Sequence, residues 1–337
     1  VAPCDAPALS AVRRWFEAHE GTPGAAAYCL TRVAGEAYDA WYTTPRGHYD
    51  ADGEAAREEL YRHVVACEGI GLPLVLLARQ PLRYPLFFDL DLYGPADGSR
   101  SDELSRIAWE GEDKLLVRAI VESVREVYPQ FREGLDLAVF SSSGICSMRQ
   151  RFKASFHLVF PDIIVDRPQK CHPAAGIVCD AVGLPSHIMV RNHVICRLTE
   201  RMEHLQEQLQ RCCGADDVEG PDGEPTYLND WTEVFDEWPM WHEPSPEAAT
   251  GLRLPYTDKP GEGRPKRPLG RWRFAAPPAE GRWPPRCPMQ RLPDLEPPAW
   301  VRLGDIAACT AACATEWDRD AVHEQALAAY VCLGCRG

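Results

Sequence analysis

The chain has 337 residues, 45% of them hydrophobic and 26% charged, which is typical of one large globular domain with or without a small appendage. No stretch reaches the roughly 18 consecutive apolar residues that a membrane-spanning helix needs. The net charge of −14 argues against a uniformly basic nucleic-acid-binding surface but allows a local basic groove. The fourteen cysteines are scattered, so we interpret most as reduced, buried or metal-associated thiols of an intracellular protein. Val1 in place of Met, without a signal-peptide pattern, suggests a fragment or a processed chain.

Hydrophobic periodicity predicts alternating helices and strands. We expect amphipathic helices over 8–20 and 53–68, then strands over 74–78 and 86–92. Residues 101–128 have the apolar spacing of a helix, which Pro129 should end. Beyond it we predict, in order, a strand over 135–140, a strand over about 153–165 that Pro161 could break, a polar helix over about 194–212 and a strand-like stretch over 250–256.

The strand predicted over 86–92 carries two acids inside an apolar run, PLFFDLDLY. Side chains of a strand alternate between its faces, so the leucines and Phe88 should point to a core while Asp89 and Asp91 share the opposite face, about 6–7 Å apart. Neighbouring carboxylates repel each other and shift each other's pKa, and a hard cation such as Mg²⁺ removes this conflict. For so short a pattern the alternative is two structural acids, each bonded to an Arg or Lys.

Two later stretches carry groups suited to phosphate oxygens. In KASFH, strand alternation places Lys153, Ser155 and His157 on one face, which offers an ammonium, a hydroxyl and an imidazole in a row. In GLRLPYTDK, Arg253 can bind a phosphate through two hydrogen bonds, and Lys259 adds a point charge. The alternatives are a structural histidine in the first stretch and a surface strand with an ordinary ion pair in the second.

A third acid, Asp236, follows the apolar pair Val234–Phe235 in WTEVFDEWPMW. An acid in this position can enter a site from the end of a strand. By itself this position is weak evidence for a site, because Asp236 could be an ordinary solvated acid like its neighbours Glu233 and Glu237.

Residues 261–291 are locally basic, with eight Arg or Lys against two Glu, a balance of +6. Trp272, Phe274 and Trp283 interleave with the cations, as in nucleic-acid-binding segments whose aromatic side chains stack on bases. The alternative is an extended segment that packs on the domain and keeps its arginines in water.

In their order along the chain, FFDLD, KASFH, VFD and GLRLPYTDK resemble the motifs of the archaeo-eukaryotic primase superfamily, most closely its PrimPol-like branch and the primases of herpesviruses and large DNA viruses. The resemblance covers about residues 74–275, and the spacing of six from Arg253 to Lys259 fits the family pattern. It implies an α+β fold, in which an RNA-recognition-like mixed sheet bears the acids beside a smaller α/β unit, with helices packed around. The chain would divide into an N-terminal helical region (1–73), a primase-polymerase core (74–275), a Pro- and Arg-rich linker (276–299) and a helical, Cys-containing tail (300–337).

The resemblance implies a template-directed nucleotidyltransferase, a DNA primase and polymerase that joins nucleoside triphosphates on single-stranded DNA with two Mg²⁺ or Mn²⁺ ions. Its catalytic metal ligands would be Asp89, Asp91 and Asp236. The nucleotide would be bound by Lys153, Ser155, His157, Arg253 and Lys259. Such an enzyme would serve DNA replication or damage tolerance in a nucleus, a mitochondrion or a virus's host cell, away from membranes, with a replicative helicase or a single-strand-binding protein as candidate partners.

Two features depart from the family pattern. Thr250 stands where the PrimPol-like branch often has a second arginine, three residues before Arg253. Many relatives carry a zinc module of one His and three Cys, and the tail here, which could be a truncated form of it, offers Cys309, Cys313, His323, Cys332 and Cys335. Two Cys pairs about twenty residues apart can form a zinc site, and cysteines that pack a helix are the alternative.

Two other hypotheses fit the sequence. The first is a non-catalytic nucleic-acid-binding protein of the same fold, which uses the basic segment and needs neither metal nor the acid pair. The second is another metal-dependent nucleotide enzyme, such as a phosphohydrolase, which would turn over nucleotides without a template.

Overall fold

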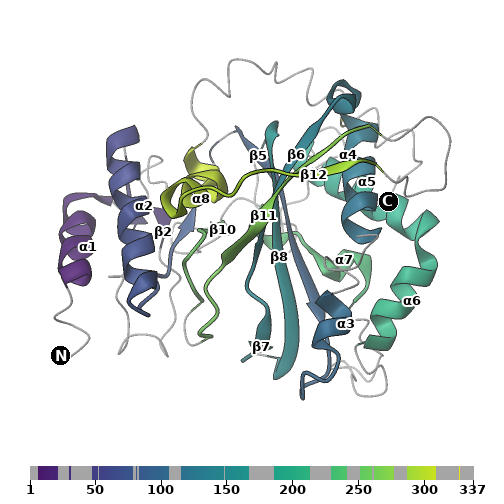
Figure 1. Ribbon diagram of the computed structural model, residues 1–337, viewed down its shortest axis with the longest axis horizontal. Coiled ribbons are helices and arrows are strands. Elements are labelled where there is room, and N and C mark those ends of the chain that lie inside the picture. The colour runs from purple at the N-terminus through teal and green to yellow at the C-terminus, as the bar shows by residue number, and fades with distance from the viewer. Residues whose placement is uncertain are drawn as a thin grey trace, which may run out of the picture.

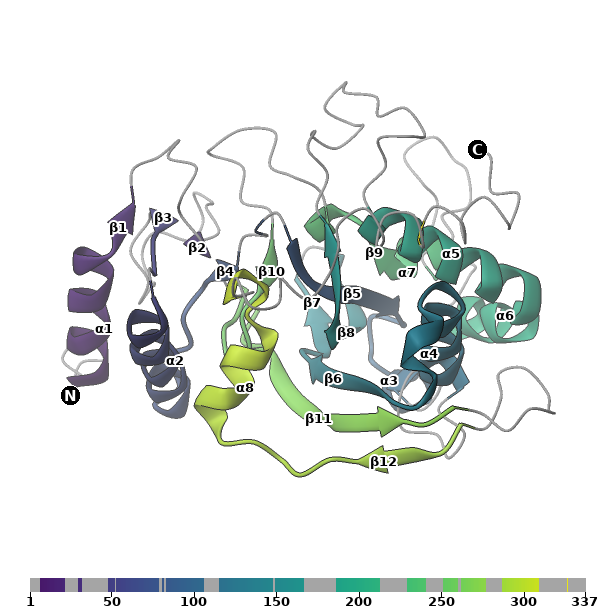
Figure 2. The same cartoon turned by 90° about the horizontal axis from the view of Figure 1, so that it is seen from above.

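The computed structural model (Figure 1) describes residues 7–21, 30–31, 48–51, 53–78, 81, 83–105, 115–147, 149–166, 186–212, 229–240, 251–259, 262–276, 287–308 and 326. These residues form a large sheet with helices α4, α5 and α6 to one side and a small sheet with α1, α2 and α8 to the other (Figures 1 and 2). The predicted α+β class is therefore confirmed. Among these residues, no helix is long and apolar enough to cross a membrane.

The large sheet is built round two long strands, β5 (Arg83–Tyr93) and β8 (Arg151–Asp166), which pair antiparallel along almost their whole length. On the far side of β5 lies β9 (Phe235–Asp236). On the far side of β8 follow, in order, β6 (Leu135–Ser141), β11 (Arg267–Phe274) and β12 (Met289–Arg291). Strand β8 also pairs with the short β7 (Gly144–Cys146). Every pairing in the described strands is antiparallel, so the expectation of a mixed sheet was wrong. The short connection from β6 to β8 makes antiparallel pairing the natural outcome, because parallel neighbours need a long crossover.

The small sheet joins residues from both ends of the predicted core. Its order is β1 (Glu20–Gly21), β3 (His48–Tyr49), β2 (Leu30–Thr31), β4 (Leu77–Ala78) and β10 (Leu252–Arg253). The strands predicted over 74–78 and 250–256 thus exist, but each forms only a two-residue ladder. Because β4 pairs with β10, the chain near residue 77 lies beside the chain near Arg253.

The predicted helices correspond to helices of the structure, with differences in extent. Helices α1 (Pro7–Ala18) and α2 (Glu54–Gly69) confirm the first two predictions. Of the helix expected over 101–128, the structure describes residues 101–105 and α4 (Leu115–Val127), which ends before Pro129 as expected, and residues 106–114 lie outside the described residues. The polar helix expected over 194–212 is two helices, and the first begins earlier because the Ser186 amide donates to the Asp166 carboxylate at the end of β8. The helices and 3₁₀ turns that remain are α3 (Ser101–Ser105), η4 (Pro129–Arg132), α5 (Ser186–Arg201), α6 (Glu203–Cys212), α7 (Trp231–Val234), η8 (Trp238–Met240), α8 (Pro297–Gly304) and η9 (Ile306–Ala308).

Pro161 shifts the register of β8 and does not break the strand. Pro85 of β5 pairs with Ile164, whereas the next residue, Leu86, pairs with Phe160. Proline has no N–H to give to the ladder, so a bulge at this point is the usual solution. The bulge sets the register that holds from Leu86 to the end of β5.

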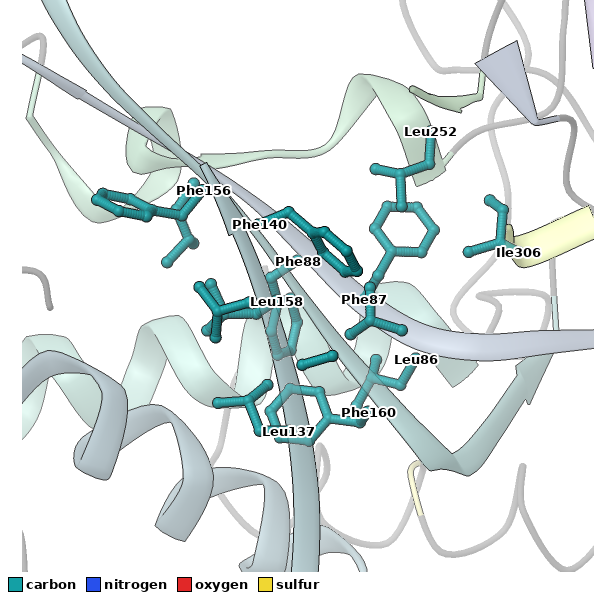
Figure 3. Packing of buried hydrophobic residues seen from close by; sticks show 14 of the residues in the cluster. Leu86, Phe87, Phe88, Leu137, Phe140, Phe156, Leu158, Phe160, Leu252 and Ile306 are labelled. Atoms are coloured by element: carbon teal, nitrogen blue, oxygen red, sulfur yellow. The ribbon is translucent and has the colours of Figure 1, made fainter. Parts of the chain in front are cut away.

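Both faces of β5 are buried. Figure 3 shows Phe87 pointing toward Leu252 and Ile306, while Phe88 packs with Phe160 on the opposite face. Phe87 and Phe88 have no exposed surface. The leucine face meets a core as predicted, but the opposite face is turned toward the small sheet and is covered as well. Of the two acids of β5, Asp91 is buried, whereas Asp89 keeps 16% of its side-chain surface exposed.

A buried acid ties α2 to the end of α8. Asp305, with 3% of its surface exposed, accepts hydrogen bonds from the Tyr61 hydroxyl at 2.8 Å and from Arg57 Nη1 at 2.9 Å. Burial, and then the Asp305 carboxylate, raise the pKa of Tyr61 above its usual range. The hydroxyl is therefore a donor at any physiological pH.

We expect Asp305→Ala to lower the free energy of unfolding by about 3 kcal/mol, because it leaves a buried hydroxyl and a guanidinium without their acceptor. Urea denaturation would measure the loss. The control is Arg302→Ala, which removes only surface ion pairs from α8 to Glu54 and Glu58 of α2 and should cost less than about 1 kcal/mol. Similar losses in the two variants would contradict a special role for the buried acid.

Candidate functional site

The pairing of β5 with β8 brings two of the predicted motifs together. In the ladder, Asp89 lies opposite His157, and Asp91 lies opposite Ser155. Residues that face each other across antiparallel strands project to the same side of the sheet. The acid pair and the polar residues of KASFH therefore share one face, although more than sixty residues separate them in the chain.

Asp236 reaches the same place from β9, where it lies opposite Asp89. This two-residue strand is fixed by Arg191 of α5, which is 5% exposed. Arg191 donates to the carbonyl oxygen of Phe235 from Nε at 2.9 Å and from Nη2 at 2.7 Å, and to Thr232 O at 2.8 Å. Our sequence analysis missed Arg191, because no local pattern links a helix residue to a strand more than forty residues later.

Buried cations balance the two acids of β5. The Lys153 ammonium forms an ion pair with the Asp91 carboxylate, and both side chains are buried. Burial opposes the charge of Lys153, but the carboxylate of Asp91 reverses this effect and raises its pKa. Burial also opposes the charge of Asp89, yet nearby His157, followed by Lys266 and Lys153, holds its pKa well below the usual range. Both lysine ammoniums thus favour the ionised form of Asp89.

Two carboxylate oxygens in this cluster are buried: Asp91 Oδ1 accepts no hydrogen bond from the described residues, and Asp89 Oδ1 has the Nε2 atom of His157 at 3.5 Å. Buried oxygens without a partner are costly, and a hard cation satisfies them. In the part of the chain that the structure describes, no group of three or more His, Cys, Asp or Glu side chains could hold a metal ion by itself. Mg²⁺, however, is commonly held by one or two carboxylates together with waters and substrate phosphates. The acid pair fits that mode of binding.

The stretch GLRLPYTDK contributes cations to the same cluster. Arg253 is buried, and its Nη2 donates to Ser142 Oγ at 2.9 Å. Lys259 is exposed as a residue, but burial of its ammonium, followed by the charges of Lys153 and Arg253, lowers its pKa. Lys259 therefore lies within electrostatic range of Lys153 and Arg253, although its side chain is exposed. All five residues predicted to bind phosphate are brought to one region.

Two cations of the basic segment also belong to this region, which we had not predicted. The Nζ atom of Lys266 donates to Ser155 Oγ at 3.1 Å. Arg264 donates to Ser142 O at 2.9 Å and crosses Gly144, where a Cβ atom would lie 2.4 Å from Arg264 Cδ. The sequence did contain a signal for this pair: Arg264 and Lys266 are two residues apart, and residues at that spacing share a face of an extended chain. The same reasoning had selected Asp89 and Asp91.

The remainder of the basic segment, as far as it is described, packs on the domain. Trp272 and Phe274 are buried, so for these two aromatics the alternative of a segment packed on the domain holds. Both aromatics lie on β11, and alternation turns their side chains inward. Arg267 and Arg273 point to solvent and pair with Glu68 and Asp136. Trp283, Arg282 and Arg286 lie outside the described residues.

The proposed zinc ligands also lie outside the described residues. They are Cys309, Cys313, His323, Cys332 and Cys335. The same holds for Thr250, at the position of the missing second arginine. The zinc hypothesis therefore stays a prediction.

Two buried histidines are held neutral. Burial, followed by the charge of Lys266, lowers the pKa of His157 to about 3. Burial also lowers the pKa of His187 to about 3. The ring of His187 bridges the Phe87 carbonyl oxygen, 2.7 Å from Nε2, and the Tyr84 hydroxyl, 2.9 Å from Nδ1. A neutral ring with its proton on Nε2 satisfies both partners.

These histidines predict acid sensitivity between pH 6.5 and pH 3. Their folded-state pKa lies below the unfolded value of about 6.5, so stability is complete above that pH and falls as the unfolded chain takes up protons that the folded chain refuses. Between pH 6 and pH 5 the two should lower the free energy of unfolding by about 2 kcal/mol. Urea titrations at both pH values would measure the drop. His187→Gln should roughly halve it, and an unchanged drop would contradict this origin.

A scan against protein-family models finds no match, and a search of curated proteins finds no significant relative. Strand pairing brings Asp89, Asp91 and Asp236 together with Ser155 and His157 on one face of the large sheet.

Proposed function

We propose that the protein is a template-directed nucleotidyltransferase, a DNA primase and polymerase that joins nucleoside triphosphates on single-stranded DNA. One observation carries the proposal. Asp91 keeps a buried carboxylate oxygen that accepts no hydrogen bond from the described residues, and the buried Oδ1 of Asp89 lies 3.5 Å from His157 Nε2, beside lysine and arginine side chains of the same cluster. Unsatisfied carboxylate oxygens suit a divalent cation, and adjacent cations suit a polyphosphate. A magnesium-bound nucleoside triphosphate combines both.

Each side chain has a role in this proposal. Asp89, Asp91 and Asp236 would hold Mg²⁺ or Mn²⁺, which when bound supplies charge neutralisation and activation of a hydroxyl nucleophile. Ser155 and the neutral His157 would contact phosphate oxygens. Arg253, Lys153 and Lys259 would orient the triphosphate. Catalysis would rest on positioning and charge, without a covalent intermediate.

The Lys153–Asp91 ion pair favours a second candidate function. If Lys153 is a permanent partner of Asp91, the acids are structural, and the protein is a nucleic-acid-binding module of the same fold that uses no metal. The two functions differ in what happens to this ion pair, because a metal-dependent enzyme must release Asp91 from Lys153 when the metal and the nucleotide enter.

Asp89→Asn and Asp91→Asn should each lower template-directed nucleotide incorporation by about a thousandfold, because a metal ligand contributes several kcal/mol to catalysis. The assay combines the full chain, Mn²⁺, a single-stranded DNA template with a primer, and nucleotides. Asp97→Asn is the matched control, since Asp97 lies in the exposed turn after β5 and bonds only locally to Ser99.

The same assay separates the competing functions. Absence of product from the wild-type chain, or equal product from Asp89→Asn, would overturn the proposal. Nucleotide hydrolysis that does not depend on the template would favour a phosphohydrolase. DNA binding that survives loss of both acids, without any incorporation, would favour the non-catalytic module.

Lys153→Met should strengthen binding of Mn²⁺ alone by about tenfold, or about 1.4 kcal/mol, because it removes the cation that competes for Asp91. Electron paramagnetic resonance of free Mn²⁺ would measure the affinity without nucleotide. The variant should bind nucleotide less well, since it loses an ammonium. If Mn²⁺ binds neither protein, the metal site does not exist; if it binds both equally, Lys153 does not compete for it.

A further inference from the structure

Lys266 is a lysine with no exposed surface. Its Nζ donates to Ser155 Oγ at 3.1 Å, which is the only hydrogen bond of either side chain to the described residues. No carboxylate of those residues lies within ion-pairing distance of Nζ. Burial lowers the pKa of Lys266 well below its usual range, with Asp89 the strongest opposing influence. An unpaired buried lysine costs several kcal/mol, so its retention calls for a physical reason.

The backbone of Lys266 is also engaged. Its N–H donates to Thr257 O at 2.9 Å, and its carbonyl oxygen accepts from Tyr256 N at 2.6 Å. Tyr256 has a φ of 61°, a left-handed conformation that costs a side-chain-bearing residue of order 1 kcal/mol or more. These bonds fasten residue 266 to the turn that joins Arg253 to Lys259. Lys266 thus connects the turn bearing two predicted phosphate-binding cations to Ser155 on β8.

We propose that Lys266 is a positioning residue that holds the Ser155 hydroxyl, and the Arg253–Lys259 turn with it, in the geometry that binds the phosphates of a nucleotide. This inference rests on the proposed function. Lys266 has no exposed surface, so it cannot touch the nucleotide and acts through Ser155.

The hydrogen bond explains how it acts. A serine hydroxyl has one donor and two lone pairs. The protonated Nζ has three N–H bonds and no lone pair, so in this form it can only donate to Ser155 Oγ. With one lone pair engaged, the hydroxyl proton turns away from Lys266 and can meet a phosphate oxygen. Ser155 lies opposite Asp91 in the ladder, so the oriented hydroxyl stands next to the acid pair.

The test is a double-mutant cycle on nucleotide affinity, measured by calorimetry with dATP and, in parallel, ATP in the presence of Mn²⁺. Lys266→Met and Ser155→Ala should each weaken binding by about tenfold, the size of one hydrogen bond to a charged group. If Lys266 acts through Ser155, the double variant should bind no more weakly than Ser155→Ala alone. In the incorporation assay, Lys266→Met should raise KM about tenfold and leave kcat within about twofold.

Arg267→Met is the matched control, because Arg267 is the next residue, is exposed and pairs with Glu68; its affinity should equal that of the wild type. Wild-type affinity in Lys266→Met, or losses that multiply in the double variant, would overturn the inference and leave the proposed function standing. If the wild-type chain binds neither nucleotide, the proposed function fails and the inference with it.

If Lys266→Met does not fold, Lys266→Gln replaces it. The glutamine amide keeps an N–H donor, but its side chain is one methylene shorter than that of lysine, so weaker nucleotide binding is again expected. Wild-type affinity in Lys266→Gln would overturn the inference.

Discussion

The register between β5 and β8 is the constraint on which the candidate site depends. A slip of one residue would turn every side chain of β5 to the opposite face and separate Asp89 and Asp91 from His157 and Ser155. Burial of both faces of β5 fixes the register firmly, because a slip would place the carboxylates among the aromatic side chains of the core. The register shift of β8 is confined to the bulge at Pro161, outside the part of the ladder that contains the acids.

Once the register is set, the electrostatics follow. Two carboxylates on a closed face cannot remain ionised without positive charge nearby. The protein supplies that charge from Lys153 on β8 and Arg253 on β10. Asp91 nevertheless keeps a buried carboxylate oxygen that accepts no hydrogen bond from the described residues. The cluster is thus rich in buried charge of both signs but incompletely hydrogen-bonded, which is the feature on which the proposed function rests.

Distant elements hold this face in place. Arg191 of α5 fixes β9 and therefore Asp236. Asn229 accepts from Tyr93 N at 2.8 Å and donates to Tyr93 O at 2.9 Å, which anchors the end of β5. Its amide also donates to Leu209 O of α6 at 2.7 Å. Through these bonds to backbone atoms, Arg191 and Asn229 fix where the strands lie.

The sequence by itself determined the local features: the helices 7–18 and 54–69, the end of α4 before Pro129, and the shared face of Asp89 and Asp91. These follow from periodicity and from proline's missing N–H, which act over a few residues. Only the tertiary structure decided that Asp236 lies opposite Asp89, that Lys266 is buried beneath Ser155, and that Trp272 packs inward. Strand pairing and the covering of a face depend on contacts between residues far apart in the chain. No local pattern encodes them.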